Sequence, residues 1–211
     1  MPGLAVACLA LVAMIQGKPD FTNASKPPRG IGDPGLAMQV VRSVKDVDAI
    51  LGEAPSPDRE AMRIKQYIDF AFIACYAALF IALARAFGSR LAYLGAAFGI
   101  CAALSDVVEN SGLLRILDVP LARVTQSMIV AIRYPSLVKW TDTWIALAIF
   151  AWLFWKSEGW LRKSIGVAFA LAAAIGVYGL FDNAFLLWAG IPMVAGLAGI
   201  ALTGIIQRAG R

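Results

Sequence analysis

The 211-residue sequence contains no histidine, only three cysteines, and few charged residues, which make up 16% of the chain. Without histidine the chain has no Ser-His-Asp or Cys-His triad, no histidine-ligated haem and no histidine-based zinc site. Cys8, Cys75 and Cys101 are odd in number, lie in apolar runs and form no Cys-x-x-Cys motif. The sequence therefore predicts neither a disulfide framework nor a cysteine metal site.

The common nucleotide and nucleophile motifs are also missing. There is no G-x-x-x-x-G-K-[ST], no G-x-G-x-x-G following a strand, and no G-x-S-x-G elbow, so no nucleotide-binding loop or hydrolase nucleophile is predicted. The net charge is +5, but the basic residues are scattered and form no single stripe, which argues against nucleic acid as a partner. We predict no cofactor and no metal.

Apolar residues account for 60% of the chain, above the roughly 45–50% of an average soluble domain. Several stretches of about 20 residues carry almost no charge, as a bilayer span requires. We therefore predict an all-α, polytopic transmembrane bundle of five or six helices within residues 67–211. The expected helices cover residues 67–87, 91–114, 138–156, 164–182 and 184–206, and residues 1–16 form an N-terminal transmembrane helix or anchor.

Two segments lie outside these spans. Residues 17–66 are predicted to be an extracytoplasmic linker that contains one amphipathic helix, over residues 36–51, which ends at Gly52. Ser56-Pro57-Asp58 predicts a new helix start that runs into the first long span. Residues 115–138 are too polar for an easy span, and we predict an amphipathic segment lying at the membrane interface.

The basic residues of the short connections predict the orientation. Arg85 and Arg90 lie near one turn, Lys156, Arg162 and Lys163 near another, and Arg208 and Arg211 follow the last helix. All lie on the same side of a hairpin bundle, and the positive-inside rule puts that side in the cytoplasm. The chain is then a multi-pass protein of the inner (plasma) membrane with a cytoplasmic C-terminus.

Ionisable side chains within the predicted spans are the candidate site, because each is costly in hydrocarbon. Asp106, Glu109 and Asn110 follow an i, i+3, i+4 spacing on one helix face, with Gly95 and Gly99 farther along the same stripe. Similar groups occur near the same end of the other helices. The candidate ligand-binding residues are Asp69, Tyr76, Asp106, Glu109, Asn110, Asp142, Asp182 and Asn183.

A shift of the sequence by 73 positions pairs several of these residues. Asp69 meets Asp142, Glu109 meets Asp182, and Asn110 meets Asn183. This indicates a duplicated helical hairpin, an arrangement that is frequent in transporters with a site between the repeats.

The chain resembles a group of uncharacterised bacterial multi-pass membrane proteins over about residues 30–115. The resemblance rests on Asp69-Phe70-Ala71-Phe72 with Tyr76, a D-F-x-F…Y helix, and on Asp106-Val107-Val108-Glu109-Asn110, a D-x-x-E-N helix. It implies the same order of elements and marks these residues, but it implies no activity.

Three functions remain open from the sequence. The acidic and amide layer binds a small cation, a proton or an amphipathic ligand; or it locks helices together in a structural or accessory subunit; or it serves a carboxylate-dependent enzyme acting on lipid. A non-enzymatic role is favoured. The predicted partners are the lipid bilayer and either another membrane protein or further copies of this chain.

Overall fold

A computed structural model describes residues 1–17, 19–22 and 30–209, and for residues 204–209 it describes the backbone alone. All regular secondary structure in this part of the chain is helical. Five helices in it are long and apolar enough to cross a membrane, which confirms the predicted all-α transmembrane bundle. They are α4 (Pro57–Phe87), α5 (Arg90–Leu117), α6 (Gln126–Lys156), α7 (Trp160–Phe181) and α8 (Phe185–Ala209).

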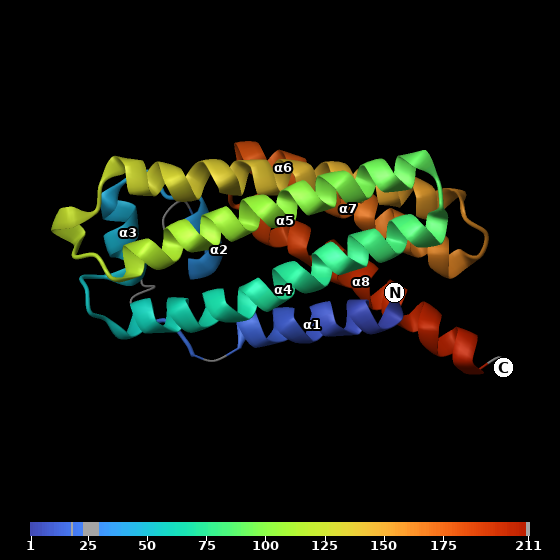
Figure 1. Cartoon of the computed structure of the whole chain (residues 1–211), viewed down its shortest axis with the longest axis horizontal. Coiled ribbons are helices and arrows are strands. Elements are labelled where there is room, and N and C mark those ends of the chain that lie inside the picture. Colours follow the sequence, from blue (N-terminus) through green and yellow to red (C-terminus); the bar gives the residue numbers. More distant parts are fainter. Residues whose placement is uncertain (18, 23–29, 210–211) are drawn as a thin grey trace.

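A sixth helix, α1 (Pro2–Gln16), turns the bundle into a closed ring. Each long helix packs against the next along the chain, from α4 to α8, and α1 packs against both α4 and α8. Figure 1 shows the six helices running along the long axis of the molecule, with the N- and C-terminal ends at the same end of the bundle. In the described part of the chain, the six helices surround a common interior.

Polar contacts hold α1 in its place in the ring. The Lys65 ammonium, on α4, donates to the carbonyl oxygens of Ile15 (2.5 Å) and Gly17 (2.7 Å) at the end of α1. A cation at this position stabilises carbonyls that have no partner within the helix. Farther along, the Cys8 and Cys75 sulfurs lie 3.2 Å apart as free thiols. The first helix is therefore fixed to α4 at two depths.

Helix α4 begins and ends where the sequence predicts. The Ser56 hydroxyl caps α4 by accepting the Arg59 N–H (3.2 Å), and Pro57 occupies the first helical position. Gly88 ends α4 with a left-handed φ of 62°, a conformation in which glycine avoids the strain of a side chain. Arg85, Arg90, Lys156 and Lys163 all lie at the end of the bundle that holds the chain termini. The side chain of Arg208 and all of Arg211 lie outside the described residues.

The predicted amphipathic helix over residues 36–51 is wrong in one respect, because two helices take its place. They are α2 (Pro34–Gln39) and α3 (Val44–Leu51). The break occurs because Ser43 starts a new helix through a capping box with Asp46, in which each side chain accepts the other's backbone N–H. Both helices lie at the end of the bundle opposite the chain termini (Figure 1).

The helix predicted over residues 138–156 is wrong at its start, because it begins inside the segment 115–138 that we expected to lie at the membrane interface. A short 3-10 helix, η2 (Leu121–Arg123), follows α5, and α6 then begins at Gln126 and runs unbroken through Pro135 to Lys156. Proline removes one helical hydrogen bond, but it does not end this helix. Residues at helical spacing are buried on one side of the added turns: Ile129, Ile132, Ser136 and Lys139. Tertiary packing therefore overrides the local polarity of the segment.

The helix boundaries bear on the register of the predicted hairpin duplication. Helices α4 and α6 are both 31 residues long and start 69 residues apart, and α5 and α7 start 70 residues apart. The 73-residue shift is therefore displaced by about one helical turn from the register of the helix starts. The residues that it pairs lie on the same side of their helices but about one turn apart along the helix axis. The duplication itself stays a prediction.

Candidate functional site

Three neighbouring helices of the ring bring seven polar side chains together, here called the buried polar cluster. The i, i+3, i+4 spacing on α5 turns its three members to one side, as predicted. All three are almost fully buried. The members of the cluster are Asp69 and Tyr76 on α4, Asp106, Glu109 and Asn110 on α5, and Ser136 and Lys139 on α6.

Lys139 is the centre of the cluster. Its ammonium lies 2.9 Å from Asp106 Oδ1 and 2.6 Å from Glu109 Oε2. The Ser136 hydroxyl donates to the same Glu109 oxygen at 2.6 Å. The side chains of the three charged residues are at most 7% exposed, so both ion pairs are shielded from water. One ammonium thus joins two carboxylates on the neighbouring helix, as buried charges require.

Two further hydrogen bonds connect α4 to α5. The Tyr76 hydroxyl donates to Asp106 Oδ2 at 3.1 Å, and the Asn110 amide donates to Asp69 Oδ2 at 2.7 Å. Both Asp106 oxygens are therefore engaged, one by lysine and one by tyrosine. The partner of Asp69 is a neutral amide, so its charge is balanced less directly than that of Asp106.

A cavity of about 510 Å³ lies inside the ring, bounded by residues from all six ring helices and from α2. Asp69, Asp106 and Lys139 are the charged residues of its wall. At the α2 end, the Trp140 indole N–H donates to Gln39 Oε1 at 2.8 Å. The rest is mainly apolar and aromatic, including Phe72, Tyr76, Leu79, Phe80, Leu147, Phe169 and Leu197. We call this space the central cavity.

The cluster divides into two parts. Asp69, Tyr76, Asp106 and Lys139 line the central cavity. Glu109 and Asn110 do not line it and are 0% and 1% exposed, held by the contacts given above. Glu109 Oε1 has no hydrogen-bond partner among the described residues. The second part contacts the neighbouring helices, Glu109 on α6 and Asn110 on α4. The first part presents charge to the cavity.

The other predicted site residues lie apart from the cluster. Asp142, on α6, is half-buried and does not line the central cavity. Asp182 and Asn183 form the α7–α8 turn, where they bond to the Ala184 N–H and the Gly179 carbonyl. These contacts are local, as expected for residues that shape a turn.

The largest omission from the sequence prediction is Lys139. Lys139 lies at the edge of the segment that we predicted to be interfacial, and its position there predicts an exposed lysine at the end of a helix. The signal that identifies it is periodicity: Ser136, Lys139 and Thr143 continue the spacing of the buried Ile129 and Ile132. A polar face in register with an apolar face indicates a helix that carries its polar residues into the bundle.

The G-x-x-x-G stripe on α5 packs against two neighbouring helices instead of one. A Cβ at Gly95 would lie 2.9 Å from the Ile149 side chain of α6, whereas a Cβ at Gly99 would overlap the Phe80 ring of α4. Small residues let α5 sit between these helices, which brings its acids within reach of both.

The chain matches no protein-family model, no curated protein and no solved structure.

Proposed function

We propose that this multi-pass membrane protein binds an amphipathic cation in the central cavity. The charged head would lie at Asp69 and Asp106, and the apolar body along the aliphatic and aromatic wall. The observation that carries the proposal is a cavity between the ring helices in which carboxylates occupy one part of a mainly apolar lining. Its volume of about 510 Å³ falls in the roughly 300–1,000 Å³ range of small-molecule sites.

The charge of the buried polar cluster favours a cationic ligand. It holds three carboxylates, Asp69, Asp106 and Glu109, against one ammonium, Lys139. With all four ionised the cluster has a net negative charge, which is costly away from water unless it is paired. A cation beside Asp69 would supply the missing positive charge.

The aromatic residues support the same ligand class. Phe72, Tyr76, Phe80 and Trp140 line the cavity close in sequence or space to the carboxylates. Aromatic faces attract cations by about 0.5–2 kcal/mol each. Carboxylates and rings together select an organic cation with an apolar part over a strongly hydrated metal ion.

Calorimetric titration of the detergent-purified protein tests the proposal with two matched probes, octyltrimethylammonium and octanesulfonate, both below their micellar concentrations. We expect saturable binding of the ammonium probe and none of the sulfonate. Asp69→Asn should weaken ammonium binding at least about tenfold, since one charge pair at 4 Å is worth roughly 4 kcal/mol at an effective dielectric constant of 20. An asparagine still accepts the Asn110 bond, so the fold is expected to persist.

Asp182→Asn is the control, because Asp182 is exposed and lies outside the cavity lining. It should bind the ammonium probe like the unchanged protein. Equal binding of both probes, or an Asp69→Asn variant that binds normally, would disprove the proposal. The proposal would also be disproved if neither probe bound saturably, which is the outcome expected if the carboxylates exchange only protons.

We also infer that the end of the bundle carrying the chain termini faces the cytoplasm of a bacterial cell, with α2 and α3 outside the inner membrane. The support is the basic residues of the short connections at that end. By the positive-inside rule, the short loops that carry such residues lie in the cytoplasm. A fluorescent protein that matures only in the cytoplasm should therefore fluoresce when fused after Arg211. A dark fusion whose full length is verified on a gel would reverse the orientation.

A further inference from the structure

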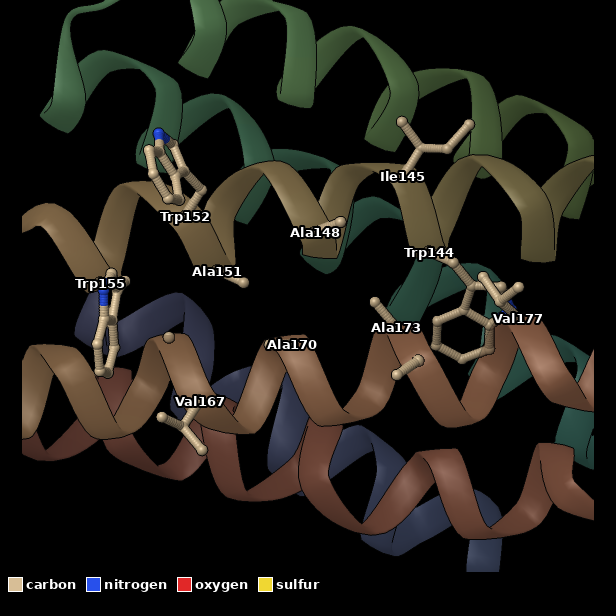
Figure 2. A pocket seen from close by; sticks show the side chains of 12 residues that line it. Trp144, Ile145, Ala148, Ala151, Trp152, Trp155, Val167, Ala170, Ala173 and Val177 are labelled. Carbon is tan, nitrogen blue, oxygen red and sulfur yellow. The ribbon is translucent and has the colours of Figure 1, made fainter.

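A second hollow lies on the outside of the ring, between α6 and α7 (Figure 2). Its volume is about 620 Å³, and its lining is almost entirely apolar. Small residues from both helices form its floor, including Ala148, Ala151, Ala170 and Ala173. We call it the outer groove. It shares no lining residue with the central cavity.

The outer groove exists because α6 and α7 meet through small side chains. At Gly166 a Cβ would lie 2.8 Å from the Ala151 carbonyl oxygen, so the two backbones approach closely there. Exposed alanines above this contact, Ala148 and Ala170, leave the surface recessed. A recess on the membrane-facing side of two spanning helices has the shape and polarity to accept an acyl chain.

One end of the outer groove is aromatic and basic. Trp152 and Trp155 line it there, and both are about half exposed. The Lys156 ammonium lies 4.6 Å from the centre of the Trp152 ring, and the Lys163 ammonium lies 5.9 Å from that of Trp155. Tryptophan at such a position marks the membrane–water interface. Lys156 and Lys163, held beside the two indoles, are therefore placed to meet a lipid headgroup at such an interface.

The charge around this end is positive overall. Between the end of α6 and the first turn of α7, Lys156, Arg162 and Lys163 face a single acid, Glu158. All four side chains are exposed. The three cations are therefore accessible to a ligand, and only one acid offsets their charge. A partner seated in the groove would meet an apolar channel that ends in excess positive charge.

We infer that the outer groove is a binding site for an anionic phospholipid. One acyl chain lies along the alanine floor, and the phosphate group pairs with Lys156 and Lys163 beside the two indoles. An apolar segment of another protein would fill the recess without using the cations, and a zwitterionic lipid would bring no net charge to them. Charge complementarity therefore selects the anionic lipid.

Quenching of tryptophan fluorescence by brominated acyl chains tests this inference. The full-length protein is placed in phosphatidylcholine nanodiscs that contain a small fraction of either brominated phosphatidylglycerol or brominated phosphatidylcholine. Each basic residue near a membrane surface strengthens binding of anionic lipid by about fivefold. We expect the phosphatidylglycerol probe to quench several-fold more efficiently than the phosphatidylcholine probe at equal mole fraction.

Two variants locate the effect. Lys156→Gln with Lys163→Gln should bring phosphatidylglycerol quenching down to the phosphatidylcholine level. Ala148→Leu with Ala170→Leu fills the groove and should reduce quenching by both probes. The matched control is Arg85→Gln with Arg90→Gln, which removes two exposed cations from the same end of the bundle but from the α4–α5 turn.

The control should keep the preference for phosphatidylglycerol. The inference is overturned if the unchanged protein is quenched equally by both lipids. It is also overturned if the double-glutamine variant retains the preference, or if the arginine control loses as much as the lysine variant, since either result assigns the effect to the general charge of the bundle end.

Discussion

Replacing Lys139 with methionine is expected to lower the free energy of unfolding by about 3–5 kcal/mol, the range for removing one partner of a buried ion pair. Methionine keeps the length and the apolar part of the side chain but leaves Asp106 and Glu109, which are 4% and 0% exposed, without their shared cation. The measurement is unfolding in mixed micelles of a maltoside and dodecyl sulfate.

Lys156→Met is the matched control for this experiment. It changes the same residue type on the same helix at an exposed position, and it should alter stability by less than about 0.5 kcal/mol. Adding Asp106→Asn and Glu109→Gln to Lys139→Met should restore part of the loss, because the carboxylates then no longer need a cation. If Lys139→Met unfolds at the same detergent composition as Lys156→Met, Lys139 does not hold the cluster together.

Gly176→Ala is expected to lower the free energy of unfolding by about 1–3 kcal/mol through overpacking. A Cβ at Gly176 would overlap the indole ring of Trp144. Trp144 is only 1% exposed, so shifting its ring would disturb the side chains packed around it. The loss is expected even though alanine is the better helix former by about 1 kcal/mol. The same micelle titration measures it.

The chain offers both a control and a rescue for Gly176→Ala. Gly190, on α8, has nothing within 4 Å of its Cβ position, and Gly190→Ala should be neutral or stabilising. Trp144→Phe, added to Gly176→Ala, should recover stability because the ring is smaller. The indole nitrogen has no hydrogen-bond partner among the described residues, so phenylalanine forfeits no bond. Equal effects at Gly176 and Gly190 would show that the indole is not a barrier.

Local signals made much of the fold predictable. A capping serine followed by proline marks where α4 begins, and a glycine in a left-handed conformation marks where it ends. The spacing of Asp106, Glu109 and Asn110 was sufficient to place them on one inward face. Each of these features depends on neighbours within about one helical turn, which is the range over which sequence patterns operate.

Features that depend on distant partners were not predictable in the same way. Lys139 is stabilised inside the bundle by carboxylates 30 or more residues away in the sequence. No residue next to it in the sequence indicates that these partners exist. Asp142, with similar local surroundings, stays out of the cavity because it falls on another side of α6. The break between α2 and α3 has a different cause. The capping signal of Ser43 and Asp46 is local, but the apolar periodicity continues on both sides of it and predicts one uninterrupted helix.

The contact between α1 and α8 has a consequence for how the protein is assembled. It joins the first and last helices of the described chain, so the ring cannot close during synthesis until α8 has entered the bilayer. Until then α1, a helix of 15 residues about 22 Å long, has only one of its two ring neighbours, α4, to pack against. The wall of the central cavity includes residues of α8, so that wall is complete only after α8 has packed against α1 and α7.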